Sequence, residues 1–368
     1  MNFDFRTNHF INELLVCLML IHAISVHTVF STLQHALELI LFVLFSLLLI
    51  GKALKKDELL LLYIFIASQI GSLLLNDLGA FLLGFKQMGL AVLAVIYFRR
   101  HACQSVFIHG AFFLCLVLVL LQYFVTNGFP LEIDDYLTHM RTWTNYKPLG
   151  IFLDYHASAY FLAVCFLGYL LQQRWYLFDF FVLILMDVKT SLISYFGQRV
   201  VSLLKIRVPI LGSYYLQLIL VIAVASLTIL FIPAFIEILT YLNLYHGISA
   251  DIILSQMADP RTYIDAIHVF PRDIVQYYDL VARDYTGIGG NKGHSNELML
   301  IVIMVQGGCV LAFSYLYFLT KSLPTYRVFI FLTLFHYAYV LTPLIIYTMY
   351  MFELRLGQRR DDLSSSKI

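Results

Sequence analysis

The chain has 368 residues, of which 61% are hydrophobic and only 13% are charged, and its mean hydropathy is +0.82. A soluble domain carries about 25% charged residues, so this composition excludes an ordinary soluble protein and indicates an integral membrane protein. The 24 basic and 23 acidic residues nearly cancel, so the net charge does not favour a nucleic-acid partner.

Apolar runs recur along the chain, and a helix that crosses a hydrocarbon core needs about 20 such residues. The predicted spans are residues 10–30, 34–51, 59–75, 78–98, 102–126, 151–171, 175–193, 209–233 and 296–319. Residues 194–207 form a short return past the sequence GQR. Residues 328–354 form one long span, or two short ones that break at 341–343. We therefore expect an all-α polytopic membrane protein with about 11–12 transmembrane segments, organised as one integral membrane domain over residues 1–368.

The basic clusters set the orientation of these spans, because Lys and Arg accumulate in cytoplasmic loops. The clusters lie at residues 52–56, 99–100, 205–207 and 321–327 and in the tail from residue 355. With these clusters in the cytoplasm, the spans alternate consistently as far as residue 327. Two long segments then lie outside: residues 127–149, and a large loop at residues 234–294 that we expect to be catalytic.

The five cysteines form neither a disulfide framework nor a zinc site. All of them lie in or beside apolar runs, and none occurs in a CxxC pair or at a Cys/His ligand spacing. The chain also contains no HExxH motif and no Walker loop. We therefore expect no metal catalysis, and a divalent ion bound by carboxylates stays open as the alternative.

Several arginines fall in the external segments, where the positive-inside rule disfavours them. Arg261, Arg272 and Arg283 are spaced eleven residues apart, and eleven residues return almost to the same helix face. Guanidinium groups bind oxyanions in a bidentate manner and stay charged, so an aligned set suits a phosphate-bearing ligand. The alternative is a solvated helix face on which they pair with neighbouring aspartates, and such surface pairs are common and weak.

Arg199 is the second signal. We expect it at a turn between two apolar segments, where a charge at membrane depth is costly and indicates a functional site. The alternative is an interfacial arginine whose side chain reaches the lipid headgroups. Arg141, in the shorter external segment, is a candidate for orienting an acceptor.

A polar stretch, GIGGNKGHSNELM, leads into the apolar run 296–319. Its glycines let the backbone approach a ligand closely, and Asn296 and Glu297 fall in the first turn of the predicted helix. His294 is then placed to act as a general base near neutral pH. Glu297 is the rival base, or it holds the imidazole in position. A helix-capping loop is the structural alternative.

The stretch GIGGNKGHSNELMLIVIMVQGG resembles the region of O-antigen polymerases and O-antigen ligases that reads roughly G-x-G, then H-N-x-x-L, then a glycine pair. His294 and Leu298 match this pattern. Ser295 replaces the usual asparagine, which stands at position 296 instead.

Three further stretches are similar to segments of the same family, in the same order, within residues 145–350. ADPRTYIDAI has Arg261 at the arginine position of an external-loop segment. FGQRVVSLL has Arg199 at the arginine of a serine-arginine-threonine segment, with departures at Gln198 and Val200. YKPLGIFLDYHASAYFLAVCFL resembles a glycine-phenylalanine element followed by small residues. The matching residues there are Gly150, Phe152, Ala157 and Ala159.

The resemblance implies a C-type membrane glycosyltransferase that polymerises repeat units of a bacterial surface polysaccharide, O-antigen or capsule. It would transfer glycan from undecaprenyl diphosphate to an acceptor sugar hydroxyl on the periplasmic face of the inner membrane, without metal or cofactor. His294 would be the base, while Asn296, Glu297 and Arg141 would orient the acceptor. The diphosphate would be bound by Arg199, Arg261, Arg272 and Arg283. Membrane lipid surrounds such an enzyme, and a flippase and a chain-length regulator are its expected protein partners.

Three other interpretations stay open from the sequence. An O-antigen ligase, which transfers the finished chain to lipid A-core, uses the same donor and the same motifs. A transporter or flippase would use Lys86, Asp187 and Lys189 within spans as coupling groups; it predicts internal repeats, which the sequence does not show. A structural membrane subunit would leave the external arginines without a role.

Overall fold

The computed structural model describes residues 2–25, 31–75, 78–125, 148–170, 177–186, 188–230, 267–271, 299–334 and 341–365. Every regular element within these ranges is a helix, and no strand occurs in them. The predicted all-α class is therefore confirmed for the described part of the chain.

Five long helices follow the first five predicted spans. They are α1 (Asn2–Ser25), α2 (Ser31–Leu49), α3 (Lys56–Leu75), α4 (Leu78–His101) and α5 (Val106–Val125). The connection between α2 and α3 is short and polar, and it turns at Gly51, which has a positive φ of 75°. Glycine adopts this conformation without a Cβ clash, so the chain reverses directly after α2.

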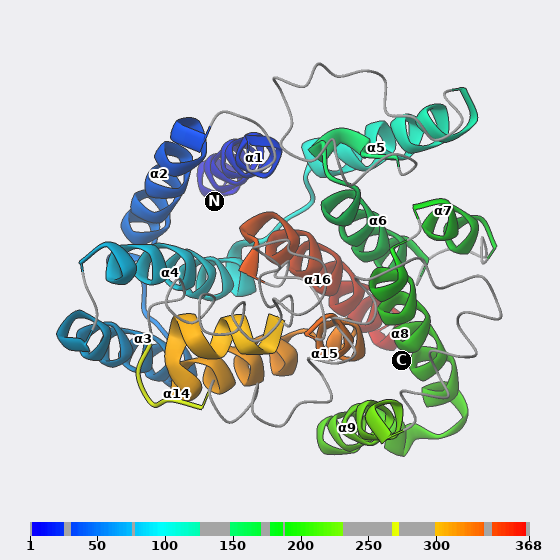
Figure 1. The fold of residues 1–368 in the computed structure, drawn as a ribbon. Helices are drawn as coiled ribbons and strands as arrows, with labels where there is room; N and C mark the ends of the chain where they lie inside the picture. Colours follow the sequence, from blue (N-terminus) through cyan, green and yellow to red (C-terminus); the bar gives the residue numbers. More distant parts are fainter. Residues whose placement is uncertain are drawn as a thin grey trace, which may run out of the picture.

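The described remainder of the chain forms short helices together with three longer ones. They are η1 (Gly150–Phe152), α6 (Tyr155–Leu170), α7 (Phe178–Met186), α8 (Lys189–Arg207), η2 (Pro209–Gly212), α9 (Tyr214–Leu230), α14 (Met299–Ser322), α15 (Arg327–Thr333) and α16 (Pro343–Ser365). The three longer helices are α8, α14 and α16. Figure 1 shows α2, α3, α4 and α14 on one side of α16, and α6, α7, α8 and α9 on the other.

Among the described helices, three are long and apolar enough to cross a membrane: Lys56–Leu75, Val106–Phe124 and Ile303–Ser322. In Val106–Phe124 only 22% of the most apolar stretch is buried inside the protein. An apolar helix that leaves so much of its surface uncovered needs lipid or another protein around it. The described helices therefore fit a membrane protein, and the full number of passes stays a prediction.

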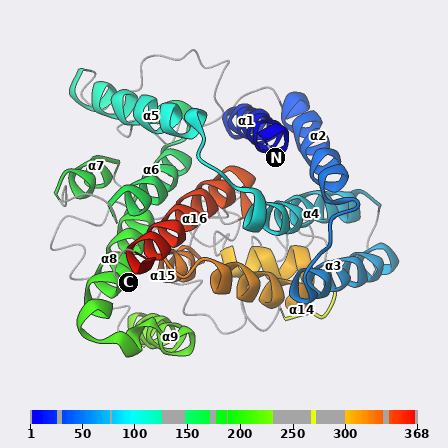
Figure 2. The ribbon, with the colours of Figure 1, turned by 180° about the vertical axis from the view of Figure 1, so that it is seen from behind.

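α16 passes through the centre of the bundle and packs against α4, α6 and α1 (Figure 1; Figure 2 shows the same arrangement from behind). Pro343 is its first residue, a position that needs no backbone N–H. The predicted break at residues 341–343 is therefore confirmed, although the helix runs on to Ser365, past the predicted end at 354. Tyr347, which is buried in this helix, donates to the carbonyl of Cys103 at 2.7 Å and fixes α16 to the end of α4.

The predicted turn at Arg199, within the short return 194–207, is wrong. α8 continues without a break from Lys189 to Arg207, and the interruption falls earlier, between α7 and α8. The glycine of the sequence GQR serves packing instead, because a Cβ on Gly197 would lie 2.6 Å from Cδ1 of Leu332. The absence of a side chain brings α8 close to α15, and the helix persists across the glycine.

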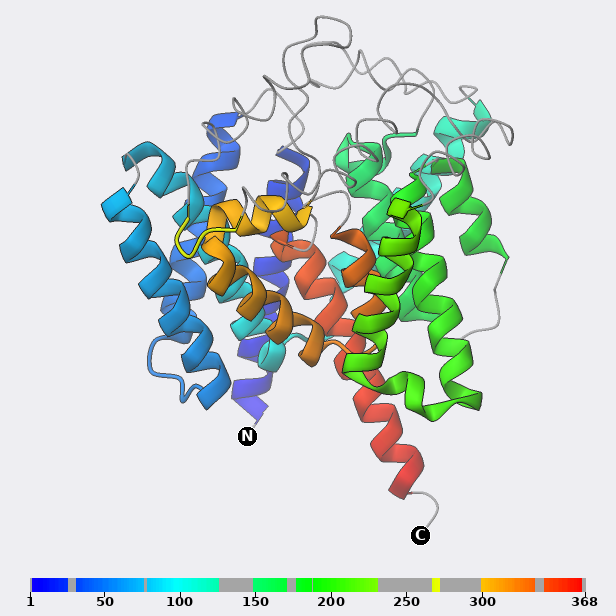
Figure 3. The ribbon, with the colours of Figure 1, turned by 60° about the horizontal axis from the view of Figure 1, so that its bottom comes forward.

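α14 is not the continuous span that the sequence predicts for residues 296–319. Gly308 has a φ of 72° and a ψ of 157°, so the helix bends at this residue. In Figure 3 the first half of α14 runs across the upper part of the bundle and the second half descends.

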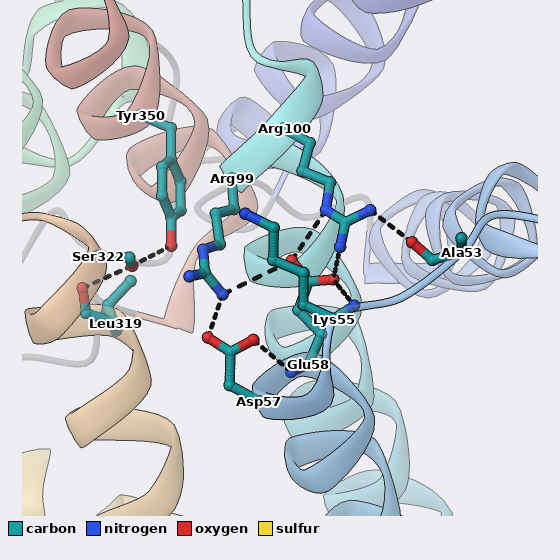
Figure 4. A network of polar contacts seen from close by, with 9 residues as sticks. All are labelled: Ala53, Lys55, Asp57, Glu58, Arg99, Arg100, Leu319, Ser322 and Tyr350. Carbon is teal, nitrogen blue, oxygen red and sulfur yellow. Dashed lines mark hydrogen bonds and ion pairs between the residues drawn. The ribbon is translucent and has the colours of Figure 1, made fainter. Parts of the chain in front are cut away.

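Basic clusters that are predicted to be cytoplasmic meet at one end of the bundle, where both termini also lie (Figure 3). Arg100, at the end of α4, binds both carboxylate oxygens of Glu58 at the start of α3, and Arg99 donates to Asp57 at 2.6 Å (Figure 4). The guanidinium of Arg99 also lies 4.8 Å from the centre of the Phe318 ring on α14. This grouping agrees with the predicted alternation of the spans, while the side of the membrane on which it lies stays a prediction.

Candidate functional site

Of the residues predicted to bind or act on a substrate, only Arg199 lies within the described part of the chain. The others lie outside the described residues: Arg141, Arg261, Arg272, Arg283, His294, Asn296 and Glu297. Their roles stay predictions. The two residues that the transporter interpretation adds around the start of α8, Asp187 and the side chain of Lys189, also lie outside the description.

Arg199 lies in the middle of α8, eleventh of its nineteen residues, and not at a turn. Its side chain is half-buried. Its guanidinium carbon lies 5.9 Å from the centre of the Tyr195 ring, one helical turn earlier on the same face. α8 is of mixed polarity and carries Lys205 and Arg207 near its end, so the functional role of Arg199 stays a prediction.

Tyr195 connects Arg199 to the neighbouring helix α7. Its hydroxyl donates to Oδ2 of Asp179, a carboxylate that is only 1% exposed. Asp179 lies in the first turn of α7, where the helix dipole favours a negative charge. The sequence analysis missed both residues, and the signal available was an acidic residue at the start of a short apolar run. A carboxylate, a phenol and a guanidinium thus follow one another across α7 and α8.

Gln198 explains one departure from the family-like arginine segment. Its side-chain oxygen accepts from the backbone N–H of Val328 at 2.9 Å and of Phe329 at 3.2 Å. These two N–H groups belong to the first turn of α15 and have no partner within that helix. Gln198 therefore caps α15 from α8. This cap and the close approach at Gly197 fix the helix that carries Arg199 against α15.

The glycine-phenylalanine stretch forms a buried turn that leads into α6. Gly150 has a positive φ of 64°, and a Cβ there would lie 2.4 Å from Oγ of Ser158. The Gly150 N–H donates to the side chain of Gln122 on α5 at 3.0 Å, and Ser158 donates to the Leu149 carbonyl at 2.5 Å. Asp154 accepts from the His156 N–H at 2.8 Å at the start of α6. The turn therefore requires glycine at position 150, because a Cβ there would collide with Ser158.

The glycine pair Gly307–Gly308 receives part of the predicted external loop. Residues 267–271 cross the bend in α14, and the His268 carbonyl accepts from the Cys309 N–H at 2.7 Å. A Cβ on Gly308 would lie 2.3 Å from the Val269 carbonyl oxygen, so only glycine permits this approach. On the other side, Ser68 of α3 donates to the Gly307 carbonyl at 2.5 Å. The bend thus leaves backbone groups that a loop and a neighbouring helix satisfy.

The chemistry that Arg199 offers is the binding of an anion. Arg199 supplies a permanent positive charge with several N–H donors, which suits phosphate oxygens. Within the described ranges, no group of three His, Cys, Asp or Glu side chains is arranged to hold a metal ion. The residues that would act on an acceptor hydroxyl are predicted outside those ranges.

No protein-family model matches the chain, and neither a curated protein nor a solved structure does. The likeness to O-antigen polymerases and ligases therefore depends on the four stretches and their order. The described structure accounts for the glycines in three of these stretches, at Gly150, Gly197 and Gly308, by packing and backbone conformation.

Proposed function

We propose that the chain is a glycosyltransferase that polymerises the repeat units of a bacterial surface polysaccharide on the periplasmic face of the inner membrane. The observation that carries this proposal is the contact of residues 267–271 with the glycine pair at Gly308. The pair belongs to the same polymerase-like stretch as His294, and residues 267–271 continue the segment that contains Arg261. Part of the predicted external loop therefore contacts the glycine end of this stretch, which supports an active site that draws on both segments.

Arg199 gives independent support, because it is a half-buried cation in the middle of a helix. A donor carried on a lipid diphosphate has its chain in the membrane, so its phosphates lie at the membrane interface. A guanidinium at that level can bind them bidentately. The buried Asp179 accepts a hydrogen bond from Tyr195, and the Tyr195 ring lies against Arg199. These contacts help to position the guanidinium.

The proposed reaction is a displacement at the anomeric carbon of the donor sugar. The acceptor hydroxyl oxygen forms the new bond, its proton passes to His294, and the bond to the diphosphate oxygen breaks with inversion. Undecaprenyl diphosphate leaves with the bonding electrons, and Arg199 and Arg261 stabilise its added negative charge. Arg272 and Arg283 extend the anion site, and Asn296, Glu297 and Arg141 orient the acceptor.

A ligase is the close alternative, since it differs only in its acceptor, lipid A-core instead of a second repeat unit. A secondary transporter is the other candidate, because Lys86 forms an ion pair with the buried Glu38 within the bundle. Buried ion pairs of this kind mark coupling sites in transporters. Product analysis separates the three: longer lipid-linked glycan, glycosylated lipid A-core, or no new glycosidic bond.

The test uses full-length protein in lipid nanodiscs with undecaprenyl-diphosphate-linked oligosaccharides extracted from the producing cells. We expect wild type to lengthen the glycan and Arg199→Gln to abolish this. Arg199→Lys should remain impaired, because lysine keeps the charge but loses the bidentate geometry. Lys205→Gln removes an exposed cation from the same helix and is the matched control, which should retain activity. If Arg199→Gln lengthens glycan at the wild-type rate, Arg199 is not the diphosphate site; if no protein makes a glycosidic bond, the proposed function is wrong.

A further inference from the structure

Four titratable side chains meet between α1, α2 and α4, in a part of the bundle that the proposed reaction does not use. They are His22 on α1, His35 and Glu38 on α2, and Lys86 on α4. Glu38 is at the centre, with a side chain that is 7% exposed. Its Oε2 contacts Lys86 and lies 3.3 Å from Nδ1 of His35, while its Oε1 lies 3.5 Å from Nε2 of His22. Gln34 also donates to Oε1, at 3.1 Å.

Nδ1 of His35 lies within hydrogen-bonding distance of two groups of opposite kind. It is 3.0 Å from Nζ of Lys86, which can only donate, and 3.3 Å from the Glu38 carboxylate, which can only accept. A neutral ring with a lone pair on Nδ1 accepts from Lys86. A protonated ring donates from Nδ1 to Glu38 and presents a cation to Lys86. The two hydrogen bonds exclude each other, and the presence of a proton on Nδ1 decides which of them forms.

We propose that His35 is a proton-binding site that controls the position of Lys86. While His35 is neutral, Lys86 bridges His35 and Glu38 and ties α4 to α2. When His35 takes up a proton, its Nδ1–H becomes the partner of Glu38, and the two adjacent cations repel each other. Lys86 then leaves the carboxylate. Its side chain is already 20% exposed, so it has a route out of the cluster.

The surroundings of the cluster favour His35 over His22 as the group that takes up the proton. α2 packs against α1 and α4, and among their described side chains the charged or titratable groups that face the cluster are His22 and Lys86. The His22 side chain is 8% exposed, whereas that of His35 is 59% exposed. The ring of His35 is therefore the less covered by protein of the two.

The position of the cluster connects the switch to the predicted external side. His35 lies in the second turn of α2, and the other end of this helix leads to the connection held by Arg100. Histidine is the side chain that ordinarily changes charge between about pH 5 and pH 8. The pairing of α2 with α4 thus responds to the pH on that side, whether or not the chain is a glycosyltransferase.

Acylation of lysine amines in the full-length protein, held in lipid nanodiscs and read by mass spectrometry, tests the switch. Lys86 reacts more readily once it leaves Glu38, and the exposed Lys321 at the end of α14 is the reference. Dividing the extent of acylation of Lys86 by that of Lys321 removes the general pH dependence of amine reactivity. We expect the Lys86 to Lys321 ratio to rise several-fold from about pH 8 to about pH 6 in wild type.

Two substitutions at His35 separate the proton from other causes. His35→Gln cannot take up a proton, so the ratio should stay at its low value throughout. His35→Arg is always charged, so the ratio should already be high at about pH 8. His109→Gln alters a histidine that pairs with Tyr169 on another helix, and it should leave the wild-type response unchanged. Equal ratios in wild type and His35→Gln at all pH values would overturn the proposal, as would loss of the response in His22→Gln alone.

Discussion

Two buried carboxylates hold α4 in place, one toward each end of the bundle, and their partners differ in kind. Glu58 is bound by Arg100 and by the backbone N–H of Lys55 at 2.8 Å, and it is 0% exposed. Glu38 is bound by Lys86 and two histidines. Arginine stays charged and binds in a fixed fork, whereas histidine gains and loses its charge near neutral pH. The network of Glu58, Arg100 and Lys55, called the latch below, therefore keeps its charges near neutral pH. A proton can rearrange the contacts of Glu38.

Removal of the latch should have the greater cost. In Arg100→Met, the fully buried Glu58 loses its bidentate partner and keeps Arg99, at 3.6 Å, as its remaining cation; breaking a buried pair typically costs about 3–5 kcal/mol. Arg100 also donates to the Ala53 carbonyl at 2.6 Å, so the connection between α2 and α3 should loosen too. The free energy of unfolding in mixed detergent micelles measures the effect.

Arg99→Met is the matched control for this substitution, since it removes the adjacent arginine of the same helix. Its closest carboxylate partner, Asp57, has a side chain that is 47% exposed, so water can replace the arginine. We expect a clearly smaller loss than for Arg100→Met. Equal losses would mean that the packing of Arg99 on Phe318, and not the burial of the carboxylate, governs this end of the bundle.

The second carboxylate should be less costly to remove. Glu38→Gln keeps a side chain that accepts from Lys86, and Lys86 can move toward solvent because it is 20% exposed. The loss of a charged hydrogen bond is then worth about 1.5–3 kcal/mol. Unfolding under the same conditions gives the comparison, and a loss equal to that of Arg100→Met would show that Glu38 is also a latch.

The sequence predicted the long helices well but not where glycines bend or join them. α1 to α5 follow apolar runs bounded by polar residues, and Pro343 marks the start of α16. By contrast, Gly197 lies inside a straight helix and Gly308 inside a bent one. The two glycines differ in what approaches them, a leucine side chain in the first case and a loop backbone in the second, and Gly308 alone of the two has a positive φ. Such tertiary contacts leave no local signal in the sequence.

The candidate site shows the same division. Arg199 stood out from the sequence because a charge in an apolar run is unusual, and it is half-buried as that reasoning requires. Asp179 and Tyr195 did not stand out, because their relation depends on how α7 packs against α8. Glu38 was missed for the same reason, although its partner Lys86 was singled out as a charge within a span.

The difference between the two networks should appear most directly in how pH changes the cost of each substitution, although the change itself is small. The loss of unfolding free energy in Arg100→Met should be the same at about pH 8 and about pH 6, because arginine stays protonated throughout.

The loss of unfolding free energy in Glu38→Gln should be larger at about pH 6. In the proposed switch, the carboxylate accepts a hydrogen bond from Nδ1–H of His35 once the proton is bound. Without the carboxylate, a proton on His35 faces Lys86 with no negative charge between them. We expect the two costs of Glu38→Gln to differ by about 1 kcal/mol or less, with His35→Gln abolishing the difference. If Glu38→Gln costs the same at both pH values, Glu38 is a fixed latch like Glu58, and the proton-binding role of His35 is wrong.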